Sequence, residues 1–188
     1  MVLSLLPWTK SAERIQAVTE MAAKMTGNAA ISMNTSVYFS EKGTADRNRA
    51  LAWFLKSVGN LEGDVEDLLD AYFQQCSLEV NCRDLAVLGA TLAADGRNPL
   101  TEEQIVPPRV ARVVRAIMAT CGMYNGSGEF AVTVGIPAKS GVGGGIAAAV
   151  PGRMGIGTCG PSLDEKGNSV AGLEILKRLS DELRLRIY

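Results

Sequence analysis

The sequence contains no histidine among its 188 residues. This absence excludes a Ser-His-Asp triad, a Cys-His dyad and a zinc site built on histidine, because each of these sites needs an imidazole. Any acid–base chemistry must therefore use lysine, tyrosine, glutamate, aspartate or cysteine side chains. Enzymes that depend on an imidazole are ruled out from the start.

Other features that the sequence lacks narrow the class further. Its four cysteines form no Cys-x-x-Cys pair, so we expect free, buried thiols, no metal and no cofactor. The net charge is −1 and basic residues are dispersed, which argues against nucleic acid or an anionic membrane as a partner. No stretch resembles a membrane-spanning helix, and the start lacks the basic region of a signal peptide. We therefore expect a cytoplasmic protein.

The first part of the chain has the pattern of a helical region. Apolar residues recur there at spacings of three and four, which is typical of helices with one buried face. Five helices are predicted, over residues 11–26, 46–58, 65–76 and 83–94, with the fifth opening at the proline pair 107–108. Weak alternation over residues 30–41 is compatible with a loop or a short helix, and the glycines of residues 121–128 indicate a loop.

Near residue 129 the apolar period changes to two, which favours strands. We predict strands over residues 130–136, 146–150 and 154–159, followed by a helix that Asn168 caps and that runs through Leu183. The chain is therefore predicted to be one α+β domain, helical over about residues 1–125, with strands and a C-terminal helix over about 126–188.

A glycine-rich run follows the first predicted strand. Lys139 and Ser140 are followed by Gly141, Val142 and three further glycines. Glycines allow the backbone to approach a ligand and leave N–H groups free to point at it, while Lys139 and Ser140 add a cation and a hydroxyl. An ordinary glycine-rich hairpin explains the same spacing, so this run alone does not decide between the two interpretations.

Four polar side chains stand where packing alone does not require them. Tyr124 lies in the predicted loop, Tyr72 lies on the inward side of its helix, and Glu41 and Asn48 flank a short polar stretch. Each also has a simpler interpretation, as a loop anchor, a core aromatic, a solvated charge and a polar residue at a helix start, respectively.

Taken together, these residues resemble a known family. The segments 41–48 (EKGTADRN), 72–80 (YFQQCSLEV), 121–124 (CGMY) and 137–142 (PAKSGV) are similar, in this order, to the serine-dependent glutaminases. The resemblance runs from about residue 3 to about residue 180. It implies the β-lactamase and transpeptidase fold, a dimer or tetramer, and hydrolysis of L-glutamine to L-glutamate and ammonia.

The same resemblance implies a role for each of these residues. Glu41 would bind the α-ammonium of the substrate, and Asn48 would hydrogen-bond its amino-acid end. Tyr72 and Tyr124 would place hydroxyls beside the nucleophile, with Tyr124 the better proton shuttle. The backbone N–H of Val142 would form half of the oxyanion hole, a donor that acts on charge developing in the transition state.

One part of the family pattern is absent. The family nucleophile is the serine of a Ser-x-x-Lys motif, yet no serine or threonine here has a lysine three positions later. The first residues resemble a segment well inside a full-length enzyme, so we expect a partial domain over residues 1–188 with an exposed sheet edge. We also expect no turnover by this chain alone. Ser140 does not replace the nucleophile, because neighbouring strand side chains point to opposite faces.

Two other interpretations stay open. The chain could be a catalytically dead glutaminase-like module that binds an amino acid or a partner subunit. It could also be another member of the penicillin-recognising fold, in which Lys-Ser-Gly matches the Lys-Thr-Gly strand motif. The spacing of Glu41 and Asn48 and the presence of both tyrosines argue against this last alternative.

Overall fold

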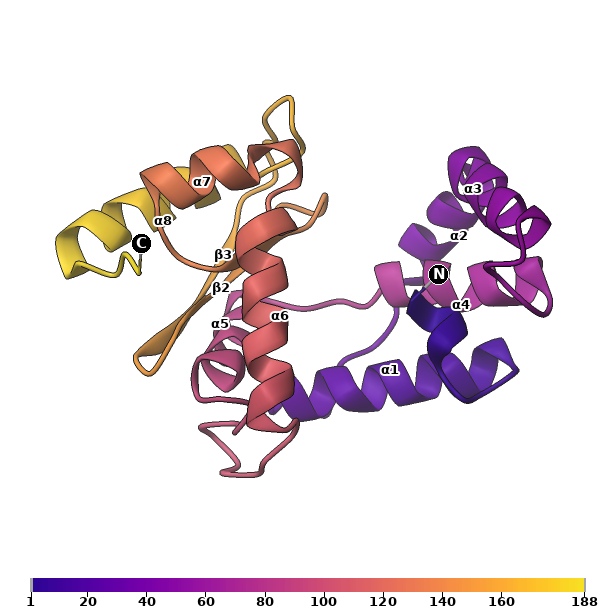
Figure 1. Ribbon diagram of the computed structural model, residues 1–188, viewed down its shortest axis with the longest axis horizontal. Helices are drawn as coiled ribbons and strands as arrows, with labels where there is room; N and C mark the ends of the chain where they lie inside the picture. Colours follow the sequence, from indigo (N-terminus) through magenta and orange to yellow (C-terminus); the bar gives the residue numbers. More distant parts are fainter. Residues whose placement is uncertain (1, 188) are drawn as a thin grey trace. The chain divides into compact units, whose positions relative to one another are not determined.

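The computed structural model describes residues 2–187, which form an α+β fold. Along the chain the elements are η1 (Val2–Leu5), α1 (Ser11–Thr26), α2 (Thr35–Gly43), α3 (Asp46–Ser57), α4 (Val65–Cys76), α5 (Cys82–Ala93), α6 (Pro108–Cys121), η2 (Tyr124–Gly126), α7 (Ser127–Thr133), β1 (Ala138–Ser140), β2 (Gly145–Val150), β3 (Met154–Cys159) and α8 (Val170–Leu183) (Figure 1). The described residues divide into two compact units. Unit 1 holds residues 2–23 and 29–79, and unit 2 holds residues 24–28 and 80–187.

Unit 1 is built mainly from helices, which pack around α4. Asp64 caps this helix by accepting hydrogen bonds from the N–H groups of Glu66 and Asp67, at 2.8 and 3.2 Å. The core of the unit collects apolar side chains from η1, α3, α4 and the intervening loops, among them Leu3, Ala52, Leu61, Val65, Leu68, Leu69 and Phe73. Because α2 and α3 also pack against α4, this helix fixes the position of both.

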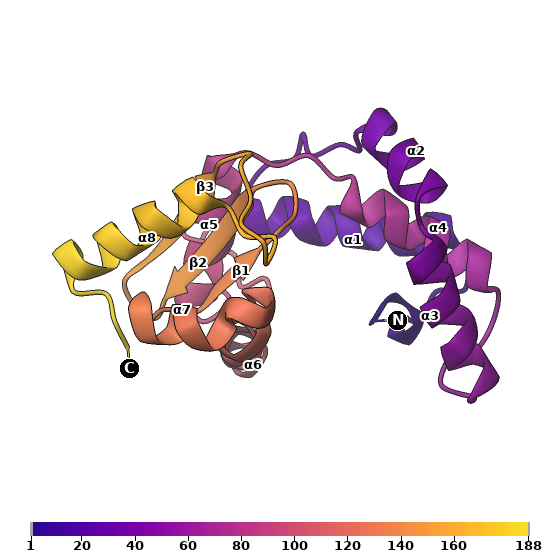
Figure 2. The ribbon, with the colours of Figure 1, turned by 90° about the horizontal axis from the view of Figure 1, so that it is seen from above.

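Unit 2 contains a three-stranded antiparallel sheet in the order β1-β2-β3. The register pairs Ala138 with Ala148 and Ala148 with Ile156. Alternate β2 residues face opposite sides, so Ile146, Ala148 and Val150 join a core with side chains of α7 and α8. The views in Figures 1 and 2 show α5 on the other side of the sheet.

Small residues allow α5 to lie directly on the sheet. A Cβ added to Gly155 of β3 would come within 2.0 Å of the backbone nitrogen of Ala90. A Cβ on Gly89 would likewise meet the carbonyl oxygen of Ala148 at 2.2 Å. Backbone therefore contacts backbone at this interface, and any side chain at either position would force the layers apart.

The predicted strand over residues 130–136 is wrong. Residues 127–133 form α7, in which Phe130 is 5 % exposed and Val132 is 75 % exposed. Phe130 and Val134 both reach the core because they are four residues apart, on one side of a helical turn. Within residues 130–140, only β1 (Ala138–Ser140) pairs with β2, so this edge strand is shorter and begins later than the alternation predicted.

Several boundaries and burial states also differ from the predictions. Residues 35–43 form α2, which Asn34 caps by accepting from the N–H of Val37, and the predicted loop at residues 121–128 contains η2 and the start of α7. The cap of α8 is Ser169 and not Asn168. The four cysteines are free, as predicted, but exposed instead of buried. The helices predicted over 11–26 and 65–76 match α1 and α4.

Within residues 2–187, no helix combines the length and the apolar character that crossing a membrane requires.

Candidate functional site

Three of the predicted site residues lie in unit 1, each on a different helix. Glu41 is near the end of α2, Asn48 is in the first turn of α3, and Tyr72 is in the middle of α4. All three are half-buried. Tyr72 also packs against the core of the unit, as its predicted inward orientation requires.

Cys76 links two of these residues. It lies one turn after Tyr72 on α4, and the two side chains share a hydrogen bond. Although Cys76 is exposed as a whole, neighbouring protein atoms desolvate its thiol and raise its pKa. The bond to Tyr72 opposes that rise, and the nearby Glu41 carboxylate adds to it. Glu41 and Tyr72 therefore act on the same thiol, and the helices that carry them, α2 and α4, pack against each other. Unit 1 therefore brings Glu41 and Tyr72 into one neighbourhood.

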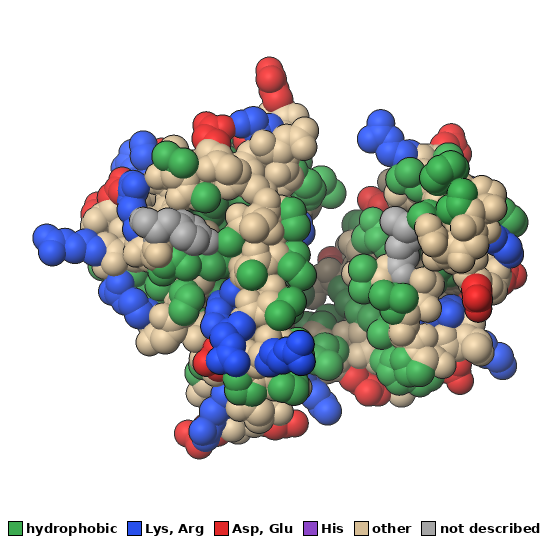
Figure 3. Space-filling view, in the orientation of Figure 1, with side chains coloured by type: hydrophobic (Ala, Val, Ile, Leu, Met, Phe, Trp, Pro, Cys, Tyr) green, Lys and Arg blue, Asp and Glu red, His purple; other side chains and the backbone are tan. Residues whose placement is uncertain are grey.

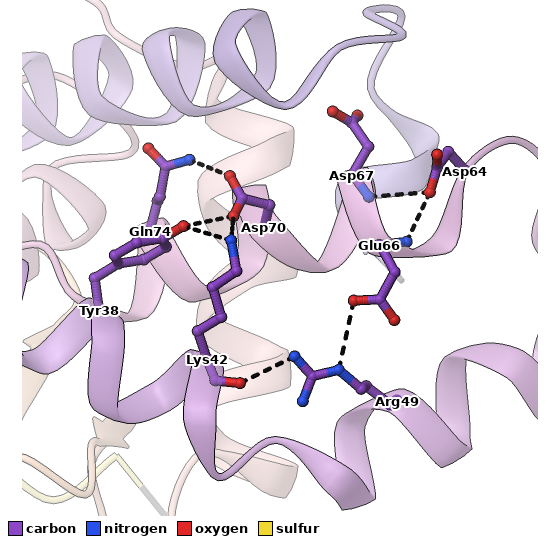
Figure 4. A network of polar contacts seen from close by, with 8 residues as sticks. All are labelled: Tyr38, Lys42, Arg49, Asp64, Glu66, Asp67, Asp70 and Gln74. Atoms are coloured by element: carbon purple, nitrogen blue, oxygen red, sulfur yellow. Dashed lines mark hydrogen bonds and ion pairs between the residues drawn. The ribbon is translucent and has the colours of Figure 1, made fainter.

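A polar network ties the helices that carry these residues (Figure 4). Asp70 of α4 accepts hydrogen bonds from the Tyr38 hydroxyl and the Lys42 ammonium of α2, each at 2.6 Å. The hydrogen bonds that the Lys42 ammonium donates to Asp70 and to the Tyr38 hydroxyl raise the pKa of Lys42 above its usual value. Arg49 of α3 donates to the backbone oxygen of Lys42 at 2.9 Å and pairs with Glu66 at 3.4 Å. Because Lys42 follows Glu41, this network sets where Glu41 stands relative to α4.

The other two predicted residues, Tyr124 and Val142, lie in unit 2. The Tyr124 ring has the Lys139 ammonium over its face, with Nζ 4.7 Å from the ring centroid, an attractive cation–π arrangement. The Lys139 side chain is exposed as a whole, yet neighbouring protein atoms desolvate its ammonium. This desolvation lowers the pKa of Lys139, although the nearby Cys121 opposes the change.

Val142 lies at the turn between β1 and β2 and is 69 % exposed. Gly141 and Gly145 close this turn with a 2.9 Å backbone hydrogen bond. Across the described part of the chain, no acceptor meets the N–H of Val142, so this donor is available to a ligand. A Cβ built on Gly167 would lie 3.6 Å from the Tyr124 ring and 3.9 Å from the Val142 side chain, so both residues border this glycine.

Ser140 does not share the face of Lys139. It is 1 % exposed, and its hydroxyl is buried on the core side of β1, whereas Lys139 points the other way. The two neighbours therefore have opposite orientations, as strand geometry predicts. A buried hydroxyl on the far side of the strand cannot act with the Lys139 ammonium on one substrate.

The structure thus forms two groups of predicted residues, Glu41 with Tyr72 in unit 1 and Tyr124 with Val142 in unit 2. It places Asn48 in the first turn of α3, in the same unit as Glu41 and Tyr72. Sequence reasoning did not single out Asp70, because an aspartate on a helix face has no local signature. Its role depends on the packing of α2 against α4, which the sequence pattern does not show.

An antiparallel sheet covered by helices, with Lys-Ser-Gly at the end of its edge strand, defines unit 2 as α+β and β-lactamase-like. Comparison of the chain with known protein families and structures agrees with this α+β, β-lactamase-like class. The family model described as glutaminase matches residues 1–188. The chain therefore belongs to the glutaminase family.

Two curated relatives come from clostridia. The chain is 58 % identical over 186 residues to the glutaminase of Clostridium tetani (strain Massachusetts / E88), a match that covers 99 % of this chain. It is 56 % identical over 185 residues to glutaminase 2 of Clostridium perfringens (strain 13 / Type A), which covers 98 % of this chain. In both cases the match spans 61 % of the relative's length.

Solved structures show the same similarity. A Bacillus glutaminase crystallised with 4.3 M NaCl superposes with a TM-score of 0.95 at 42 % identity, over 100 % of this chain and 64 % of that protein. The Bacillus subtilis glutaminase YbgJ, solved as a covalent complex with 5-oxo-L-norleucine, also has a TM-score of 0.95 at 42 % identity. That match covers 100 % of this chain and 66 % of YbgJ.

Proposed function

We propose that this chain supplies substrate-binding and oxyanion-stabilising residues of a glutaminase that hydrolyses L-glutamine to L-glutamate and ammonia. In this reaction a serine hydroxyl attacks the side-chain amide carbon, ammonia leaves with the transferred proton, and water then hydrolyses the acyl ester. The observation that carries the proposal is the arrangement in unit 2. There, the Tyr124 ring and the Val142 side chain border the same glycine, and Lys139 lies over the tyrosine ring. Within residues 2–187 the N–H of Val142 has no acceptor.

Each proposed role follows from the chemistry of the group. The Glu41 carboxylate binds the α-ammonium of glutamine, and Asn48 hydrogen-bonds its amino-acid end. The hydroxyls of Tyr72 and Tyr124 lie beside the nucleophile, and Tyr124 moves the proton. The Val142 N–H donates to the oxygen that becomes negative in the transition state. We propose that residues 1–188 all belong to one such catalytic domain.

The nucleophile itself is not among these residues, because none of the 188 positions begins a Ser-x-x-Lys or Thr-x-x-Lys motif. We therefore propose that the chain alone has no glutaminase turnover. The test compares the chain with a chimera that joins it to the part of the Clostridium tetani relative outside the 186-residue match. Ammonia release from glutamine is measured for both, and only the chimera is expected to be active.

Variants of the chimera test the assigned residues. Tyr124→Phe is expected to lower kcat by about 10²- to 10⁴-fold, the range for loss of a proton-transfer group. Glu41→Gln is expected to raise KM strongly, whereas Glu62→Gln, an exposed glutamate of the same unit, leaves both constants unchanged. If the chain alone is active and stays active after Ser140→Ala, the proposal that it lacks the nucleophile is contradicted. Glutamate binding by the chain together with an inactive chimera would instead indicate a dead amino-acid-binding module.

We further propose a homo-oligomer in the cytoplasm. Leu51, Phe54 and Val58 follow one side of α3 and its end and are 50, 62 and 52 % exposed, which suits an interface between copies. Figure 3 shows apolar side chains on the surface where α2 and α3 lie. The four free thiols are the state that a reducing compartment maintains. Sedimentation should show an oligomer that Phe54→Asp dissociates, and a monomer before the substitution would contradict this assignment.

A further inference from the structure

Tyr124 holds a backbone conformation that tyrosine seldom adopts. Its φ is +51°, in the left-handed region, and it lies in η2 between α6 and α7. This conformation is sterically strained for a non-glycine residue, because the Cβ atom crowds the backbone. Gly122 and Gly126 lie nearby and could adopt a positive φ at no steric cost, yet their φ values are −73° and −92°. The strain therefore rests on the tyrosine, and the surrounding structure must hold it there.

A single buried hydroxyl binds the N–H of the residue before this tyrosine and the carbonyl oxygen of the tyrosine itself. Ser127, 6 % exposed, accepts a hydrogen bond from the N–H of Met123 at 3.1 Å. The same oxygen donates its proton to the carbonyl oxygen of Tyr124 at 2.9 Å. The carbonyl of Met123 is held as well, by the N–H of Gly126 at 3.0 Å and by the Asn168 amide at 3.4 Å. The Ser127 hydroxyl thus connects the N–H of Met123 to the carbonyl of Tyr124 and holds the two-residue segment that contains the strained residue.

We propose that Ser127 is a positioning residue that keeps the Tyr124 ring beneath the Lys139 ammonium. Its two hydrogen bonds fix the backbone of Tyr124, and this backbone fixes where the ring can point. The ring then lies 4.7 Å from Lys139 Nζ and within 3.6 Å of a Cβ built on Gly167. Without the hydroxyl, the backbone of Tyr124 relaxes toward an ordinary negative φ and the ring leaves Lys139. We call the two hydrogen bonds of the Ser127 hydroxyl the clamp. The consequence for glutamine hydrolysis rests on the proposed function, whereas the clamp itself does not.

The first experiment uses the 188-residue chain and NMR. Ser127→Ala is compared with Ser180→Ala, which also removes a fully buried hydroxyl of unit 2, one that donates to the Val134 carbonyl at 2.5 Å. A ring over an ammonium shifts the side-chain protons of that lysine. Ser127→Ala is expected to reduce this shift of the Lys139 protons by half or more, and Ser180→Ala to leave it unchanged while lowering stability. Equal shifts in wild type and Ser127→Ala would overturn the proposal.

A measurement on the unsubstituted chain serves if Ser127→Ala does not fold. The N–H of Met123 precedes α7 and has the Ser127 hydroxyl as its acceptor. It should therefore exchange with solvent far more slowly than the exposed N–H of Val142. Similar exchange rates for the two amides would overturn the clamp without any substitution.

Activity separates this proposal from the proposed function. In the active chimera, Ser127→Ala is expected to lower kcat by roughly 10- to 100-fold with little change in KM, as misplacement of a catalytic group does. Ser180→Ala should keep kcat. If the chimera has no glutaminase activity, the proposed function fails, and the NMR and exchange results still decide the clamp. If Ser127→Ala retains full kcat in an active chimera, the positioning role is refuted.

Discussion

Asp70→Asn is expected to destabilise unit 1 by about 2 kcal/mol. The Asp70 carboxylate is the centre of the network in Figure 4, where it accepts from Tyr38 and Lys42 at 2.6 Å and from Gln74 at 2.8 Å. An asparagine loses the charge that strengthens these bonds, and its amide nitrogen can only donate. At least one of the three donors is then left without its acceptor.

The magnitude follows from how exposed the partners are. Lys42 is 45 % exposed and Asp70 is 23 % exposed, so solvent screens the ion pair and we assign it under about 1 kcal/mol. The hydrogen bonds from Tyr38 and Gln74 to a charged, less exposed acceptor contribute about 1 to 1.5 kcal/mol in total. A loss of about 2 kcal/mol corresponds to a shift of roughly 1 M in the urea midpoint.

Tryptophan fluorescence is the assay, because the only two tryptophans of the sequence, Trp8 and Trp53, both belong to unit 1. The matched control is Asp67→Asn on the same helix. Asp67 has a single ion pair, to Arg14 at 3.4 Å, and its replacement should cost less than about 1 kcal/mol. An unchanged urea midpoint for Asp70→Asn, or an equal loss for Asp67→Asn, would refute the reasoning.

The effect of Asp70 should also depend on pH. Burial raises the pKa of Asp70, but hydrogen bonds from Lys42, Tyr38 and Gln74 lower it more, so the folded-state pKa is below its usual value. A carboxyl group whose pKa is lower in the folded state stabilises the fold at pH values above its unfolded-state pKa of about 3.9. This stabilisation is lost as the pH falls through the folded-state pKa. The difference between wild type and Asp70→Asn should be constant near neutral pH and shrink in acid. A difference that persists in strong acid would contradict the charge argument.

Two further predictions concern unit 2. Gly122→Ala should destabilise it by several kcal/mol, because the new Cβ would lie 1.9 Å from the carbonyl oxygen of Ala138. Gly128→Ala, in α7 with nothing within 4 Å, should instead leave stability unchanged or raise it by up to about 1 kcal/mol, as thermal unfolding followed by circular dichroism can show. Desolvation lowers the pKa of Lys139, and the Glu129 carboxylate raises the pKa of Lys166. Because only a neutral amine reacts, Lys139 should be acetylated at a lower pH than Lys166. Peptide mass spectrometry across a pH series checks this order, and earlier acetylation of Lys166 would be inconsistent with it.

The helices of the first part of the chain could be predicted from the sequence, with α1 and α4 at their observed bounds. Long segments with apolar residues at spacings of three and four have only one way to bury a continuous face. The absence of histidine and of a Ser-x-x-Lys motif, and the resemblance to the glutaminases, were also properties of the sequence. The family model matches residues 1–188, which confirms the resemblance.

Only the tertiary structure decided between strand and helix for residues 127–133. Phe130, Val132 and Val134 alternate as a strand would, yet Phe130 and Val134 also suit one side of a helix. Seven residues are too few for the period to distinguish these structures, so the choice depended on which side chains the sheet could bury. Contacts distant in sequence likewise placed Lys139 over Tyr124 and Asp70 against Lys42. Such contacts depend on how helices and strands pack, because residues 15 or 28 positions apart share no local pattern.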